Sequence, residues 1–238
     1  SRENHAKREA VLEKLSRLEP LSRSDVLRFK REIFRRARKG PKATYRNGRG
    51  QLNSKLYPGN YYICLPRAKK GKYPLLIGLH GGGPGVGDGK TSMQKWAFAV
   101  RMGAICVFPT VIKKEATAWN KEREERYVMA LIEELKRTFP IDTNRIYLVG
   151  HSMGGYGTWS IGTHYADVFA GLAPCAGGIF VMRGAGGAIG LARGTVVNLK
   201  NTPIYFYHGA DDPRVPPTSD RKAAEVLAEL KKKYDPYE

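Results

Sequence analysis

Short apolar runs alternate with amphipathic segments along most of the chain. The runs have the length of buried strands, and the segments between them repeat apolar side chains every three or four residues, as helices do. The predicted strands are 60–65, 75–80, 104–109, 145–150, 169–175 and 203–208, and the predicted helices are 92–102, 122–138, 154–165 and 219–233. This alternation predicts an α/β fold with a mostly parallel central sheet flanked by helices.

The first part of the chain has a different pattern. Residues 5–39 place apolar side chains between charged ones at helical spacing, which predicts two amphipathic helices that are separated at Pro20 and end at Gly40. Turn-forming residues in 42–59 predict a connector. The expected organisation is a basic helical N-terminal extension at 1–45, a linker at 46–59 and an α/β domain at 60–238.

Charge sets the N-terminal extension apart. The formal net charge is +19, and residues 1–50 contribute 16 basic minus 6 acidic residues, or +10. Such an excess suits contact with a polyanion such as nucleic acid, an anionic membrane surface or an acidic polysaccharide, and a solvated helical arm is the alternative. No run approaches the ~20 apolar residues of a membrane span. Because the chain begins at Ser1, earlier removal of a leader is an open alternative, and the sequence assigns no compartment or oligomeric state.

The run Tyr-Leu-Val-Gly-His-Ser-Met-Gly-Gly-Tyr-Gly at residues 147–157 joins a predicted strand to a predicted helix. Its Gly-x-Ser-x-Gly pattern is typical of a nucleophile elbow centred on Ser152. So tight a turn strains the central residue and requires small neighbours, which Gly150 and Gly154 provide. The start of the following helix directs its N–H groups at an oxyanion. Ser152 is therefore the candidate nucleophile.

Two other predicted strands are followed by candidate site residues. The run His-Gly-Gly-Gly-Pro-Gly at 80–85 leaves backbone N–H groups accessible, so we predict an oxyanion hole formed by Gly82 and Met153, with Gly81 as the alternative donor. After residues 203–208, a Gly-x-x-Asp-x-x-Val pattern places Asp212 where it can orient a catalytic imidazole. Its neighbour Asp211 is the alternative, expected to face solvent or cap the loop.

Other candidates are weaker. Trp119 follows a predicted strand and is expected to form an aromatic wall of the substrate pocket. The pairs Glu124-Glu125 and Glu133-Glu134 are expected on the solvated face of a helix, without the context of a glycosidase dyad. The three cysteines have neither metal nor disulfide spacing and are expected to be buried thiols. No metal or cofactor is expected.

Three blocks in this order carry a resemblance: residues 79–83, 142–159 and 208–216. With them, residues 61–234 resemble the α/β-hydrolase superfamily, in its esterase, polyhydroxybutyrate depolymerase-like and predicted-peptidase branch. The resemblance implies a serine nucleophile, an acid and a histidine in that chain order, acting through a covalent acyl-enzyme. In the family, that histidine lies on a loop after one more strand.

The chain departs from the family in its histidines. No histidine follows Asp212, and the five present are His5, His80, His151, His164 and His208. We expect His80 and His208 to be buried structural residues and His151 to point away from the nucleophile. The final strand and helix of the fold, and the triad histidine, are expected beyond Glu238, so the chain is interpreted as truncated.

Three functional hypotheses follow. The first is a serine esterase that cleaves carboxylic esters of a small molecule or a polymer. The second is a serine peptidase of the prolyl-oligopeptidase type, because the same triad cleaves amides. The third is a non-catalytic binding protein on a hydrolase fold that uses its basic arm.

Overall fold

The computed structural model describes residues 9, 11–14, 16, 19–68, 71–82, 85–113, 118–179, 181–183, 189–191 and 196–233. The chain divides into two compact units, Ser1–Gly40 and Pro41–Glu238. The unit boundary after Gly40 lies near the expected end of the N-terminal extension at residue 45, and residues 46–59 belong to the second unit.

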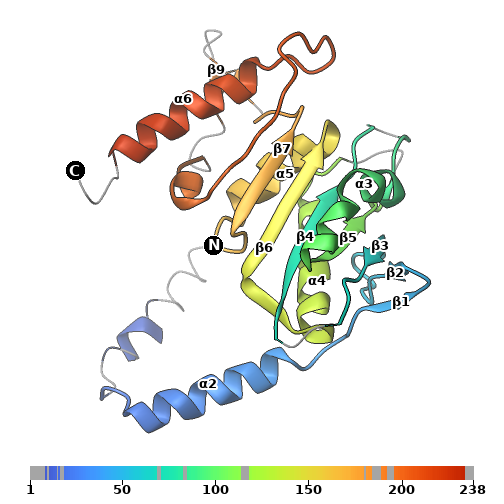
Figure 1. Cartoon of the computed structure of the whole chain (residues 1–238). Helices are drawn as coiled ribbons and strands as arrows, with labels where there is room; N and C mark the ends of the chain where they lie inside the picture. Colours follow the sequence, from blue (N-terminus) through green and yellow to red (C-terminus); the bar gives the residue numbers. More distant parts are fainter. Residues whose placement is uncertain are drawn as a thin grey trace. The chain divides into compact units, whose positions relative to one another are not determined.

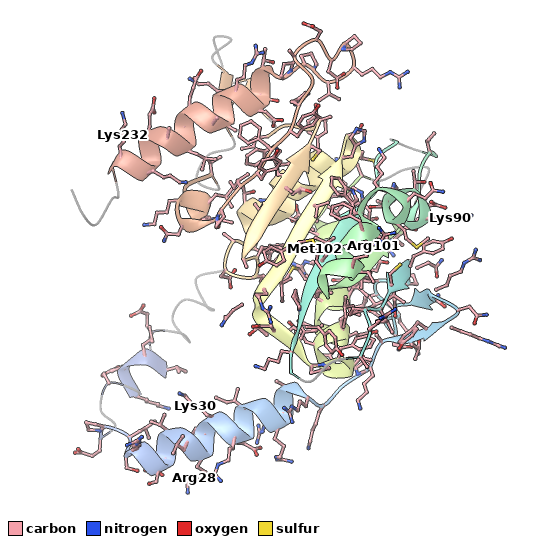
Figure 2. All side chains as sticks on the ribbon, in the orientation of Figure 1. Arg28, Lys30, Lys90, Arg101, Met102 and Lys232 are labelled. Carbon is pink, nitrogen blue, oxygen red and sulfur yellow. The ribbon has the colours of Figure 1, made fainter. Side chains whose placement is uncertain are left out.

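The N-terminal unit contains helix α2 (Arg23–Ala37). The helix is capped by the preceding residue Ser22, whose hydroxyl accepts the N–H of Asp25 at 3.1 Å and donates to its carboxylate at 2.6 Å. Figure 2 shows the side chains of Arg28 and Lys30 extending from this helix. The second expected amphipathic helix is confirmed, whereas much of the first lies outside the described residues.

The second unit is built on one sheet. Its strands are β1 (Thr44–Arg46), β2 (Arg49–Gln51), β3 (Asn60–Cys64), β4 (Tyr73–Leu79), β5 (Ile105–Pro109), β6 (Ile141–His151) and β7 (Gly171–Cys175). They are ordered β1-β2-β3-β5-β4-β6-β7 within the described residues (Figure 1). Strand β3 runs antiparallel to β5, whereas β5, β4, β6 and β7 are mutually parallel. The expected mostly parallel sheet is confirmed.

Helices cover both faces of the sheet. They are α3 (Gly89–Trp96) with its 3-10 continuation η1 (Ala97–Met102), α4 (Glu122–Thr138), α5 (Met153–His164), η2 (Val196–Asn201) and α6 (Thr218–Lys233). Side chains alternate between the faces, so Ile105 and Val107 of β5 join the core under α4 and α5, while Cys106 and Phe108 pack under α3. The fold therefore has three layers, with the larger core on the side of α4 and α5.

The segment expected to be a connector contributes to the sheet. Strands β1 and β2 form a hairpin that pairs with β3. The turn residues Asn47 and Gly48 have φ values of 51° and 74°, the left-handed conformation that a type I′ hairpin turn requires. The expectation of a linker at 46–59 is therefore wrong for its first half.

Of the paired glutamates of α4 that are expected on its solvated face, three lie on the buried face instead. Glu124, Glu125 and Glu134 are buried. Glu124 accepts the N–H of Ile112 at 2.9 Å, and Glu134 accepts the N–H of Asn53 at 3.0 Å. Burial of these carboxylates is tolerated because each receives hydrogen bonds from a distant segment.

The strand expected at 203–208 is reduced to two isolated bridges. Ile204 and Tyr207 pair in parallel with Leu172 and Cys175 of β7. These bridges still carry the chain along β7, so residue 208 reaches the same edge of the sheet as the ends of β4 and β6. A separate small hairpin is formed by β8 (Val181–Arg183) and β9 (Ile189–Leu191).

Helix α5 lies unusually close to the sheet because it is rich in glycine. A Cβ atom at Gly154 would lie 2.3 Å from the carbonyl oxygen of Leu79, and one at Gly155 would lie 2.5 Å from that of Cys175. A Cβ atom at Gly157 would overlap the Cβ of Trp119. The glycines thus allow the start of α5 to sit between the ends of β4 and β7.

Candidate active site

Ser152 occupies a strained turn between β6 and α5. Its φ and ψ are 57° and −119°, a conformation that non-glycine residues rarely adopt. Its N–H donates to the carbonyl of Cys175 at 2.9 Å, and its own carbonyl accepts the N–H of Tyr156 at 3.0 Å. A Cβ atom at Gly150 would lie 2.2 Å from the carbonyl oxygen of Gly154. This is the geometry of a nucleophile elbow.

The glycine turn after β4 lies beside the elbow. A Cβ atom at Gly81 would lie 3.2 Å from the Cβ of Ser152, and Gly82 has a φ of 114° that favours glycine. Met153 is the first residue of α5, so its N–H has no acceptor within the helix. The turn and the helix start therefore meet at the candidate nucleophile, as an oxyanion hole requires.

A cavity of about 370 Å³ opens next to Ser152. It brings together the predicted nucleophile, both predicted oxyanion donors and the loop after the last bridge. Its lining consists of Gly82, Ala118, Asn120, Ser152, Met153, Tyr156, Arg214 and Val215. Hollows of about 560 and 760 Å³ elsewhere on the second unit contain no member of this group. The chemistry of the lining, rather than size, identifies the candidate site.

Asp212 lies in residues 208–216, here called the acid loop. Its Oδ1 accepts the N–H groups of Arg214 at 2.9 Å and Val215 at 3.0 Å. These backbone hydrogen bonds, with smaller contributions from the charges of His208 and His151, lower the pKa of Asp212. The residue is therefore a carboxylate at neutral pH. Asp211 is exposed, whereas Asp212 is only partly so.

No protein-family model matches the chain. A bifunctional acetylxylan esterase/xylanase of Neocallimastix patriciarum is 30% identical over 154 residues, 63% of this chain and 21% of that protein. A solved structure of a thermostable esterase is 29% identical with a TM-score of 0.59, covering 72% of this chain and 48% of that one. The chain therefore has the fold of the α/β-hydrolase superfamily and is similar to esterases within it.

A shorter match points to the same part of the superfamily. A poly(3-hydroxyalkanoate) depolymerase C of Paucimonas lemoignei is 39% identical over 51 residues, which is 21% of this chain and 12% of that protein. The chain thus spans about a fifth or less of the length of these two relatives. The resemblance inferred from the sequence is confirmed at the level of the superfamily and its esterase-like members.

The histidines of this α/β-hydrolase are held in structural contacts wherever the structure describes them. His80 is buried, and its Nε2 accepts the N–H of Val111 at 3.3 Å. His151 Nδ1 accepts a hydrogen bond from Lys95 Nζ at 3.0 Å, and burial, followed by the Lys95 charge, lowers the pKa of His151. His164 contacts Glu125 at 2.9 Å. His5 lies outside the described residues.

Trp119 does not form the predicted wall of the pocket. Its side chain is fully buried, and its indole N–H donates to the carbonyl of His80 at 2.9 Å. Its neighbours Ala118 and Asn120 line the cavity instead. The aromatic ring supports the glycine turn from below, because its T-shaped contact with the His80 ring has a centroid distance of 5.2 Å.

Sequence reasoning missed several members of the site. Tyr156, one turn into α5, was readable from the elbow motif, since a residue four positions after the nucleophile faces the same side of the helix. Arg214 and Val215 follow Asp212 directly. Asp220, which contacts His208 and Trp159, gives no signal in the sequence, because these partners lie 12 and 61 residues away.

No group of three or more His, Cys, Asp and Glu side chains that could hold a metal occurs in the described part of the chain. Cys106 and Cys175 are buried and Cys64 is partly so, all three as free thiols. None of the helices in the described ranges combines the length and the apolar character that a bilayer crossing requires.

Proposed function

We propose that this α/β-hydrolase is a serine esterase that cleaves carboxylic esters. The observation that carries the proposal is the strained Ser152 beside Gly82 and Met153 in one cavity. The similarity to an acetylxylan esterase/xylanase and to a thermostable esterase supports an ester rather than another acyl substrate.

The proposed reaction has two halves. Ser152 Oγ attacks the ester carbonyl carbon while a histidine takes its proton, and the carbonyl oxygen becomes an oxyanion held by the N–H groups of Gly82 and Met153. The histidine returns the proton to the departing alcohol, leaving an acyl-serine. Water then attacks the acyl group, releasing the acid and restoring Ser152.

Asp212 is proposed to orient that histidine. Its Oδ1 is engaged by backbone N–H groups, so Oδ2 is the oxygen available to an imidazole Nδ1–H. The lowered pKa keeps the carboxylate ionised, which stabilises an imidazolium during attack. The identity of the base stays a prediction, namely a histidine in sequence beyond residue 238.

The cavity suggests the size and polarity of the substrate. Its volume of about 370 Å³ lies at the small end of ligand sites, and Ala118 and Val215 give it apolar walls for a short acyl chain. Asn120 and Arg214 add polar groups that suit a hydroxylated alcohol part. We therefore propose short-chain esters as substrates. Polyanion contact through residues 1–50 stays a prediction.

Active-site labelling tests the proposal. A fluorophosphonate should add one adduct to the native full-length protein at Ser152, found by peptide mass spectrometry, and none to the Ser152→Ala variant. An acyl-ester panel from acetate to octanoate should show hydrolysis that declines with chain length. Labelled protein that cleaves peptide amides instead of esters would establish a peptidase. Absence of both labelling and hydrolysis in folded protein would favour the binding-protein hypothesis.

A further inference from the structure

A buried cluster supports the acid loop from beneath. His208 is the first residue of the loop, and both of its ring nitrogens are engaged. Nδ1 lies 2.7 Å from Oδ2 of Asp220, and Nε2 contacts the carbonyl oxygen of Val215. Asp220 is 1% exposed, and its Oδ1 accepts the indole N–H of Trp159 at 2.8 Å.

The partners determine the protonation of this cluster. A carbonyl oxygen only accepts, so Nε2 of His208 must carry a proton. The carboxylate of Asp220 already accepts from Trp159, and its other oxygen shares a second proton with Nδ1. The His208–Asp220 pair therefore holds a proton on each side of the ring and is electrically neutral as imidazolium and carboxylate. Loss of one proton would leave a buried negative charge and two lone pairs facing each other.

The cluster fixes Val215 from both sides. Its carbonyl accepts from His208, and its N–H donates to Asp212. Val215 also lines the cavity beside Ser152. Trp159, which donates to Asp220, belongs to α5, the helix that begins directly after Ser152. The contacts thus join the nucleophile's helix to the acid through three side chains.

We propose that His208, as an imidazolium held by Asp220, is a positioning residue that fixes the acid loop relative to the nucleophile's helix. The inference rests on the proposed ester hydrolysis for its effect on rate, whereas its structural part stands independently. His208 touches no substrate in this role. It acts on the carboxylate of Asp212 through Val215 and directly, since Nε2 lies 3.9 Å from Oδ2 of Asp212, and it holds Val215 as one wall of the cavity.

The surrounding charges make the arrangement sensitive to pH. Burial lowers the pKa of His208, but the hydrogen bonds to Asp220 and Val215, together with the charges of Asp220 and Asp212, outweigh burial and raise it. Burial raises the pKa of Asp220, and its bonds to His208 and Trp159 offset part of that rise. Loss of the shared proton would leave a buried negative charge without a partner. The pair therefore keeps this proton to a higher pH than a free histidine does.

Other titratable groups lie near the pair, but their titration is not expected to produce the same pH dependence. Tyr156 on α5 and Cys175 at the end of β7 both interact with Asp220, and burial raises the pKa of each. His151 faces Asp212 from β6, and burial, with the Lys95 charge, lowers its pKa. The positioning contact should therefore be complete below the unfolded histidine pKa of about 6.5 and be lost as pH rises through the higher folded value.

The Asp220→Asn substitution separates the charge from the contact. The asparagine oxygen can still accept from Trp159, and its NH₂ can donate to an unprotonated Nδ1, so a neutral ring still donates from Nε2 to Val215. In the wild type, thermal stability should fall as pH rises from 6.5 to 9, and kcat/KM should fall with it once the catalytic histidine has lost its proton and become an active base. In Asp220→Asn this fall should be absent. The His208→Gln variant should lose roughly 10- to 100-fold in kcat/KM, mainly in kcat.

A matched control uses a second histidine–carboxylate pair, which joins α5 to α4. His164 contacts Glu125 outside the cavity, so His164→Gln should keep the pH profile of the wild type. A direct measurement needs no activity: ¹⁵N spectra of the histidine-labelled wild type should show a ring protonated at both nitrogens at pH 7. Its signal should disappear in His208→Gln.

The outcomes separate the inference from the proposed function. A His208 ring with one protonated nitrogen at pH 6, or an Asp220→Asn profile with the same alkaline fall as the wild type, overturns the inference even if esters are hydrolysed. A protein without esterase activity that still shows the doubly protonated ring and the pH-dependent stability overturns only the esterase proposal.

Discussion

The nucleophile elbow and the acid loop end at the same cavity but are held in different ways. Ser152 is fixed by the backbone, through its bond to Cys175 and the close approach of Gly150 to Gly154. The acid loop is fixed by side chains, since His208 and Asp212 hold it at Val215. Steric constraints do not change with pH, whereas the protonation of the His208 ring does. One half of the site is therefore permanent and the other half depends on conditions.

The largest expected effect comes from breaking the backbone half. In Gly150→Ala, the new Cβ would lie 2.2 Å from the Gly154 carbonyl, and a backbone atom cannot rotate away as a side chain does. We expect a loss of roughly 2–4 kcal/mol in the free energy of unfolding, measured by urea denaturation, and loss of fluorophosphonate labelling.

Gly171→Ala on neighbouring β7 provides the control. A Cβ there would lie 3.4 Å from the Tyr147 ring, an ordinary contact, so its stability should stay within about 1 kcal/mol of the wild type. Equal destabilisation by both substitutions would mean that the elbow imposes no special steric demand.

The acid itself tests the other half. Asp212→Asn should keep the backbone hydrogen bonds through its remaining oxygen but lose the charge that orients the histidine. We expect a fall of roughly 10³- to 10⁴-fold in kcat with little change in KM. Asp211→Asn, one residue earlier and exposed, should retain nearly full activity in the same steady-state assay. A reversed ranking of the two variants would assign the acid to Asp211.

The smallest expected effect on activity comes from the lining of the cavity. Asn120→Ala should raise KM severalfold for esters with a hydroxylated alcohol part, because Asn120 lines the cavity. Trp119→Phe removes the indole hydrogen bond to His80, so it should cost about 1–2 kcal/mol of stability and leave KM unchanged. Steady-state kinetics and thermal melts distinguish these results. An unchanged KM in Asn120→Ala would remove Asn120 from the substrate site.

The same contrast explains which features the sequence could predict. The elbow around Ser152 is a contiguous motif whose steric requirements lie within a few residues, so its geometry follows from residues 147–157. Helix α4 begins and ends where its periodicity predicts. The hairpin at Asn47 and Gly48 also had a local signal, an Asn-Gly turn that was interpreted as part of a connector.

Other features depend on partners that are distant in sequence. Glu134 is buried because the N–H of Asn53, 81 residues earlier, pairs with it. Trp119 follows a strand as the pocket residues do, but whether it faces the cavity or the core is decided by the packing of Gly157 against it. The Asp220 contacts likewise join segments that only the fold brings together. Periodicity shows whether a residue is expected on a buried or an exposed face, but not which residue it packs against.

The glycine-rich start of α5 has a consequence for folding. Gly154, Gly155, Gly157 and Gly162 each disfavour an isolated helix by about 1 kcal/mol relative to alanine, so α5 has little tendency to form alone. It is stabilised by the strands that it approaches so closely. The reactive conformation of Ser152 should therefore arise only once β4, β6 and β7 have assembled, and partly folded chains should carry an unreactive serine. The rate at which a refolding sample gains the ability to react with a fluorophosphonate would then report when the sheet is complete.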